Sequence, residues 1–131
     1  MSIDSIGDFL TIIRNGVFAV KRQVTVPYSN LKHQIAQVLK SEGFITDVVV
    51  ETNENKHKNL IIHLKYADGE SVIHEITRIS SPGLRRYEGA TSIKPVIGGL
   101  GISVLTTNRG IMTNKKARAL GVGGEIICTV W

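Results

Sequence analysis

The first half of the chain alternates between helix-like and strand-like patterns of apolar residues. Apolar side chains recur every three or four residues and predict one helix over residues 6–17 and a second over residues 30–42. Asp4 and Ser29 can cap the starts of these helices; Asn15-Gly16 is predicted to stop or fray the first, and Gly43 to end the second. Runs rich in β-branched residues predict strands at residues 23–26, 44–51 and 60–66. The expected order is therefore helix, strand, helix, strand, strand.

The second half is predicted to be mostly β, with one short helix. Strands are expected at residues 72–79, 84–87, 102–106 and 125–131, and Asp68-Gly69 and Asn108-Arg109-Gly110 are expected turns. Thr113 can cap a helix over residues 114–120, which Gly121 ends. The run Ser80-Ser81-Pro82-Gly83 breaks the pattern and marks a predicted domain boundary. The predicted fold class is α+β (mixed α/β), with an N-terminal α/β domain over residues 1–79 and a mostly β C-terminal domain over residues 80–131.

Charge separates the two halves. Residues 1–70 hold eight Lys/Arg and eight Asp/Glu, whereas residues 71–131 hold eight against three, which accounts for the whole net charge of +5. A polyanion such as RNA therefore prefers the second half, since Lys and Arg release counterions from phosphates. Met1-Ser2-Ile3-Asp4 does not open a signal peptide, no apolar run approaches about 20 residues, and Cys128 has no cysteine to pair with. The expected compartment is the cytoplasm.

No residue pattern indicates catalysis, a metal site or a cofactor. The four histidines do not stand at metal-ligand spacing, and Cys128 lies in a predicted terminal strand, where it is expected to be a buried structural residue rather than a nucleophile. Two glycine clusters, residues 98–101 and 121–124, leave two interpretations open. They lack the spacing of a dinucleotide or nucleotide loop, so helix caps and tight turns are favoured over a small enzyme that uses a cofactor there. Close approach of their amides to a phosphate stays possible.

Blocks along nearly the whole chain, taken in order and spacing, resemble the family of the eighth protein of the bacterial small ribosomal subunit. The blocks are residues 8–15 (DFLTIIRN), 26–32 (VPYSNLK), 39–45 (LKSEGFI), 78–87 (RISSPGLRRY), 98–102 (GGLGI), 106–113 (TTNRGIMT) and 120–128 (LGVGGEIIC). The resemblance implies two α/β domains, a non-catalytic structural protein of the cytoplasmic ribosome, and no cofactor. It also implies primary binding to the central domain of small-subunit ribosomal RNA, assembly of the platform, and contacts with neighbouring small-subunit proteins. An autoregulatory complex with the protein's own messenger RNA would use the same surface.

The chain departs from the family pattern at two places. The polar tripeptide is usually Ser-Thr-Ser followed by Lys-Gly, but here it is Thr106-Thr107-Asn108 followed by Arg109-Gly110. Hydrogen-bonding capacity is kept, with an amide in place of one hydroxyl. Arg86 stands where a β-branched apolar residue is common, which adds either a phosphate contact or a solvent-facing charge.

The predicted RNA-binding residues lie mainly in the C-terminal domain. They are Thr106, Thr107, Asn108, Arg109, Gly110, Tyr87, Arg85, Arg86, Lys115, Lys116, Gly123, Gly124 and Glu125, with Tyr28, Ser29 and Lys32 at a helix start as a second contact. Three roles have alternatives. The side chains of the tripeptide form hydrogen bonds either with base edges and sugar hydroxyls of RNA or with the backbone of their own turn. Tyr87 stacks on a base or packs on the core. Glu125 accepts from a base or from turn amides.

Overall fold

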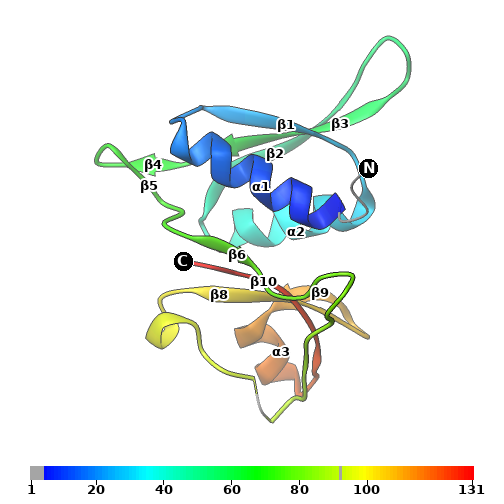
Figure 1. Ribbon diagram of the computed structural model, residues 1–131, viewed down its shortest axis with the longest axis vertical. Coiled ribbons are helices and arrows are strands. Elements are labelled where there is room, and N and C mark those ends of the chain that lie inside the picture. The colour runs from blue at the N-terminus through cyan, green and yellow to red at the C-terminus, as the bar shows by residue number, and fades with distance from the viewer. Residues whose placement is uncertain (1–4, 92) are drawn as a thin grey trace. The chain divides into compact units, whose positions relative to one another are not determined.

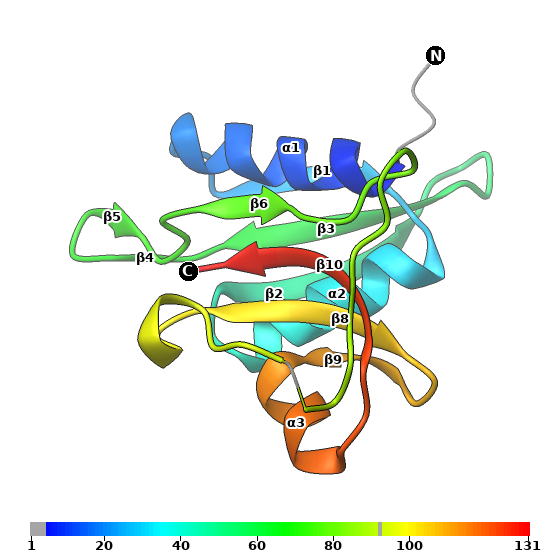
Figure 2. The same ribbon diagram turned by 60° about the horizontal axis from the view of Figure 1, so that its bottom comes forward.

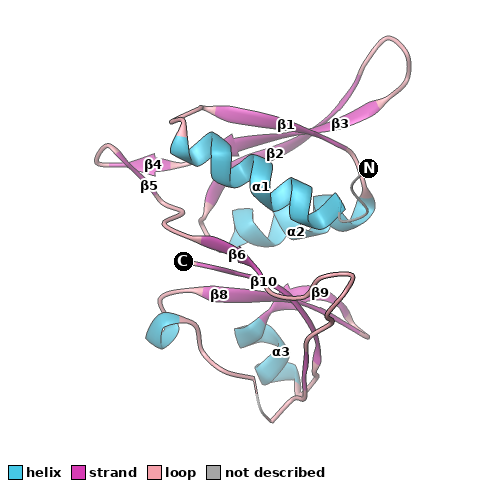
Figure 3. Ribbon diagram, in the orientation of Figure 1, coloured by secondary structure: helices cyan, strands magenta, loops and turns pink. Residues whose placement is uncertain are grey.

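The structure is a computed structural model that describes residues 5–91 and 93–131 (Figure 1). Its helices and strands confirm the predicted α+β class (Figure 3). The chain divides into two compact units, one of residues 8–73 and one of residues 74–131 together with residues 5–7 of the described part. The predicted cap Asp4 lies outside the described residues. None of the helices in the described part has the length and apolar character needed to cross a bilayer.

The first unit has the predicted order of two helices and three strands. Its three-stranded antiparallel sheet has the order β1-β3-β2, and a small hairpin at the Asp68-Gly69 turn follows it. The elements are α1 (Ser5–Phe18), β1 (Gln23–Pro27), α2 (Asn30–Ser41), β2 (Ile45–Thr52), β3 (Lys58–Leu64), β4 (Tyr66–Ala67) and β5 (Glu70–Ser71).

One face of this sheet forms the core of the first unit. Every second residue of β1 and β3 is buried, among them Val26, Leu60 and Ile62, and the residues between them are more exposed. Ile13 on the apolar face of α1 and Ile35 on that of α2 are fully buried. Burial on alternate strand residues and on one helix face is the pattern of helices packed on a single face of a sheet.

The ends of the helices depend on local chemistry. The Ser29 hydroxyl caps α2 by accepting from the Lys32 backbone N–H at 3.1 Å, and Gly43 follows the helix with a φ of 81°, as predicted. The predicted stop at Asn15-Gly16 is wrong, because α1 continues to Phe18. Gly16 is buried, and an added Cβ would overlap the side chain of Val24. This glycine allows close packing of α1 on β1 rather than ending the helix.

The second unit is a sheet covered by one short helix. The sheet has the order β6-β10-β8-β9, and β7 pairs with the other end of β10. Figure 2 shows β10 between β6 and β8. The elements are β6 (Ile76–Arg78), β7 (Tyr87–Glu88), a 3-10 turn η1 (Ile97–Gly99), β8 (Ile102–Thr107), β9 (Gly110–Thr113), α3 (Asn114–Leu120) and β10 (Gly124–Val130).

The helix of the second unit agrees with the sequence, whereas the strand expected at residues 72–79 does not. Thr113 caps α3 and Gly121 ends it with a φ of 70°, as predicted. The strand expected at residues 72–79 is shorter, and it pairs with β10 in the C-terminal sheet, so residues 76–78 are not part of the sheet of the first unit. The predicted boundary after residue 79 therefore does not follow the sheets. The partner of a strand is set by distant residues, which a local breaker such as Pro82 does not report.

Candidate nucleic-acid interface

A row of side chains crosses three strands of the second sheet. Thr106 on β8 pairs with Glu125 on β10, which pairs with Tyr87 on β7. Residues directly opposite one another on paired strands project to the same face of the sheet. The neighbouring row, Leu105 with Ile126, belongs to the core under α3. The structure therefore brings three of the predicted RNA-binding residues together on the face opposite this core.

Tyr87 does not pack on the core. Its relative exposure is 68%, so most of the ring is accessible to solvent. Because β7 pairs with β10, the backbone of this residue is fixed while its ring stays accessible. The core-packing alternative is excluded, and a flat, exposed aromatic ring beside polar side chains is the geometry that base stacking needs.

Glu125 is held by a network within the protein. Its Oε2 accepts from the Ser80 hydroxyl at 2.6 Å and from Arg85 Nη1 at 3.0 Å. The buried Ser80 hydroxyl in turn accepts from the Arg86 backbone N–H at 2.9 Å. Glu125 thus fastens the segment that leads into β7, through a hydroxyl and a guanidinium rather than the turn amides considered from the sequence.

The network also sets the charge state of Glu125. Partial burial favours the neutral acid and raises the pKa, but the hydrogen bonds from Ser80 and Arg85 and the charges of Arg85 and Arg78 outweigh it. The pKa of Glu125 is therefore below its ordinary value, and the side chain is a carboxylate at neutral pH. Ser80 was not a predicted site residue, because Ser80-Ser81-Pro82-Gly83 is typical of a breaker and no local signal reports its distant partner.

The polar tripeptide divides into residues with different tasks. The Thr107 hydroxyl accepts from the Arg109 backbone N–H at 3.0 Å and donates to the Gly110 carbonyl at 2.9 Å, so it satisfies the turn between β8 and β9. Asn108 and Arg109 are exposed at the tip of this turn. No hydrogen bond joins the Asn108 side chain to another of the described residues. Asn108 therefore keeps its amide for a partner, while Thr107 shapes the turn that presents it.

Gly123 and Gly124 are required by close approach of neighbouring strands. An added Cβ on Gly123 would overlap the Glu88 carbonyl, and one on Gly124 would overlap the Thr106 carbonyl. Both obstructing atoms belong to backbone, which cannot move without disturbing the sheet. These glycines allow β7 and β8 to lie against the start of β10 and so bring the row of side chains together.

The other predicted phosphate contacts of this unit lie on its surface. Lys115 and Lys116 are exposed in the first turn of α3, and the Lys115 ammonium donates to the Gly99 carbonyl at 3.1 Å. Arg86 and Arg109 are exposed as well. Positive charge in the first turn of a helix opposes the helix dipole, so an anionic partner would stabilise it.

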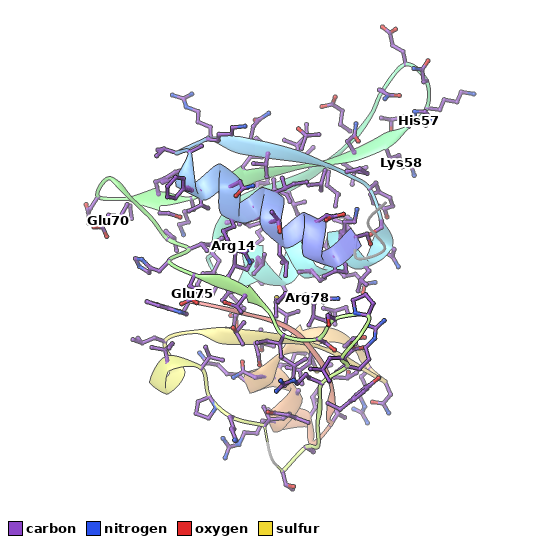
Figure 4. All side chains as sticks on the ribbon, viewed as in Figure 1. Arg14, His57, Lys58, Glu70, Glu75 and Arg78 are labelled. Carbon is purple, nitrogen blue, oxygen red and sulfur yellow. The ribbon has the colours of Figure 1, made fainter. Side chains whose placement is uncertain are left out.

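The second predicted RNA contact lies in the first unit, and two of its three residues already form hydrogen bonds with the protein's own backbone. Lys32 is buried and its ammonium donates to the Pro27 carbonyl at 3.1 Å, while the Ser29 hydroxyl caps α2. The half-buried ring of Tyr28 has the ammonium of Lys58 5.6 Å from its centroid. Figure 4 labels Lys58 at the start of β3. Lys32 thus positions the strand–helix junction, and the accessible cation beside Tyr28 is Lys58, which the sequence did not single out.

The candidate catalytic and metal-binding residues are dispersed or buried. Among residues 5–91 and 93–131, no three His, Cys, Asp or Glu side chains gather where they could hold a metal ion. Cys128 is fully buried, and burial raises the pKa of its thiol to about 12 despite the nearby positive charge of Arg78. A thiol with this pKa is not a nucleophile at neutral pH.

Comparison with known proteins gives a consistent family. The model of the family described as ribosomal protein S8 matches residues 4–131. The chain is 51% identical over 127 residues to small ribosomal subunit protein uS8 of Chromobacterium violaceum, covering 97% of this chain and 96% of that protein. It is 48% identical over 128 residues to uS8 of Marinobacter nauticus and 49% over 128 residues to uS8 of Pseudomonas fluorescens, covering 98% of this chain and 97% of each relative. These matches confirm the resemblance carried by the sequence blocks: the chain belongs to the ribosomal protein S8 family.

Proposed function

We propose that this protein is a structural constituent of the small ribosomal subunit that binds the central domain of small-subunit ribosomal RNA and helps to assemble the platform. The observation that carries the proposal is the row of Tyr87, Glu125 and Thr106 beside the exposed turn at Asn108. The names of its relatives, small ribosomal subunit protein uS8, support the same role. The compartment is then the cytoplasm, and neighbouring small-subunit proteins are further partners.

The shape of this surface suits irregular RNA. Proteins recognise RNA through the shallow minor groove, the 2′-hydroxyls and unstacked bases. The Asn108 amide can both donate and accept at such groups, and the exposed Tyr87 ring can stack on a base. Thr107 and Glu125 act indirectly, because their polar atoms fix the turn and the segment before β7. Gly110, Gly123 and Gly124 shape the same surface.

Exposed cations of the second unit supply the electrostatic part of binding. Arg86, Arg109, Lys115 and Lys116 are exposed, and they belong to residues 71–131, which carry the whole net positive charge. The Arg85 guanidinium forms an ion pair with Glu125, and half of this side chain is exposed. Arg85 therefore stabilises the fold and can also contact an RNA phosphate. Tyr28 and Ser29 form a second, smaller contact in the first unit, with Lys32 in a positioning role. The protein's own messenger RNA would bind the same surface as the ribosomal RNA.

A salt titration of binding tests the proposal. The full chain is measured against a central-domain ribosomal RNA fragment and against a random duplex, with the variants Asn108→Ala and Lys115→Ala/Lys116→Ala. Asn108→Ala is expected to weaken the ribosomal fragment alone and leave the salt slope unchanged, because base-edge contacts specify while phosphate contacts position. The lysine variant is expected to weaken both RNAs and make the slope shallower by up to about one per lost phosphate contact. Equal affinity of the unchanged protein for both RNAs would contradict the proposal.

A further inference from the structure

The sheet of the second unit carries a groove beside its core. On the face that α3 covers, Leu105, Met112 and Ile126 pack against Ala117 of the helix. The start of the helix contacts the sheet at Ser103, whose backbone N–H donates to Asn114 Oδ1 at 3.2 Å. There a groove of about 350 Å³ opens between the segment around β7 and the chain that leads into η1. A volume of this order is at the lower end of those of small-molecule sites.

The floor of this groove joins hydroxyl groups to apolar surface. Ser103 on β8 and Thr129 on β10 are directly paired, so their side chains lie side by side on the same face. Ile79 and Ile126 line the groove beside them. Hydroxyls that both donate and accept, set in an apolar floor, suit a flat ligand with a polar edge or a sugar.

The walls of the groove carry two cations and one carboxylate. Arg86 and Glu88 flank Tyr87 on one side, and Lys94 lies on the other. Arg86 and Lys94 are exposed, so their charged groups are accessible to an anion at the rim. The Glu88 carboxylate can accept from the amino group or the ring N–H of a base. A phosphate between the cations and a base over the floor would satisfy all three charged groups.

We propose that this groove binds a single unstacked nucleotide of the RNA that the protein holds, with its phosphate at Arg86 and Lys94 and its base and sugar over Ser103 and Thr129. The inference rests on the proposed function, because it assigns a further subsite on the same partner. Tyr87 borders the groove and also pairs with Glu125, so the groove adjoins the row of side chains on the other face. A nucleotide that leaves its stack next to Tyr87 reaches the groove without leaving the protein surface.

Nuclear magnetic resonance of the full-length protein tests the groove directly. The four ribonucleoside 5′-monophosphates are titrated one at a time, with inorganic phosphate as a separate probe. The nucleotides are expected to shift the backbone amides of Ile79, Ser103 and Thr129, with saturation at about 1–10 mM, as for a weak single-nucleotide site. Lys94→Glu is expected to weaken this binding by about tenfold, because it replaces an attraction with a repulsion. The matched control is Lys21→Glu, an exposed lysine of the first unit, which is expected to leave the shifts unchanged.

A second pair of variants connects the groove to RNA binding. Thr129→Val removes one floor hydroxyl at nearly constant volume, whereas Thr25→Val makes the same change at an exposed position of β1 in the first unit. Thr129→Val is expected to weaken binding of the ribosomal RNA fragment about three- to tenfold, and Thr25→Val is expected to have no effect. The groove proposal is overturned if the RNA fragment binds normally while the nucleotides cause no shift of the groove amides, or if phosphate alone binds as tightly as the nucleotides. If the fragment does not bind at all, the proposed function fails instead, and the nucleotide shifts still decide the groove.

Discussion

Replacing Glu125 by Gln is expected to destabilise the second unit by about 1–2 kcal/mol. A hydrogen bond to a charged group contributes about 1.5–3 kcal/mol, but Gln keeps one oxygen that can still accept from Ser80, so only the charge-assisted part is lost. The ion pair with Arg85 adds less than about 1 kcal/mol, because half of the Arg85 side chain is exposed. The larger loss comes from the contact with Ser80, which is fully buried at 2.6 Å from the carboxylate.

The effect depends on pH with a definite sign. Because the network lowers the pKa of Glu125 in the folded state, the unfolded chain binds its proton at a higher pH. The stabilisation is therefore present above the ordinary pKa of a glutamate and is lost as the pH falls through the lowered value. Glu125→Gln should be less stable than the natural chain at pH 6–7, and the difference should shrink toward pH 3.

Urea unfolding at several pH values, followed by the fluorescence of Trp131, measures this difference. Trp131 is the single tryptophan of the chain and lies in the same unit, where its indole N–H donates to Glu75 at 3.0 Å. Glu88→Gln is the matched control, a half-buried carboxylate on the neighbouring strand with no hydrogen bond or ion pair to another described residue. It should change stability by less than about 0.5 kcal/mol. Equal stability of Glu125→Gln and the natural chain at pH 7, or a difference that persists unchanged at pH 3, would refute the assigned network.

Three further outcomes follow from particular side chains. Gly16→Ala should lower the free energy of unfolding by about 1–3 kcal/mol in urea denaturation, because the added methyl overlaps Val24 and outweighs the gain in helix propensity. Cys128 should not react with a thiol reagent at pH 8 in the folded protein and should react after unfolding, since its thiol is buried with a pKa of about 12. Cys128→Ala should cost about 1–2 kcal/mol and leave RNA affinity unchanged in a filter-binding assay, and a large loss of affinity would contradict its structural role.

Local chemistry made much of the fold predictable. The starts of α2 and α3 are capped by the hydroxyls of Ser29 and Thr113, and left-handed glycines at residues 43 and 121 follow their ends. Each of these signals acts within four residues along the chain, so the sequence alone predicted both ends of both helices. The same local rule failed at Gly16. There the need for glycine comes from the side chain of Val24, which belongs to a different element.

Long-range pairing was the part that sequence could not supply. Residues 76–78 form a strand whose partner, β10, follows more than forty positions later, and Glu125 finds Ser80 at a separation of 45 residues. The sequence around each of these residues does not indicate its distant partner. A strand was expected at residues 84–87, whereas β7 spans only Tyr87–Glu88. The apolar and basic residues of this segment do not show which of its backbone groups pair with another strand.

The polar residues of the candidate surface separate into two classes, and the separation predicts how each fails. Ser80, Thr107 and Glu125 direct their polar atoms at the protein, so a substitution there disturbs the fold of the second unit before it disturbs any partner. Asn108 and Tyr87 are exposed on elements that others hold in place. Loss of RNA affinity should therefore accompany loss of stability in the first class and occur without it in the second. Most of the polar and glycine residues that the sequence brings to notice, such as Thr107, Glu125 and Gly124, therefore hold the backbone of this surface in place. Few of them are exposed and able to contact a partner.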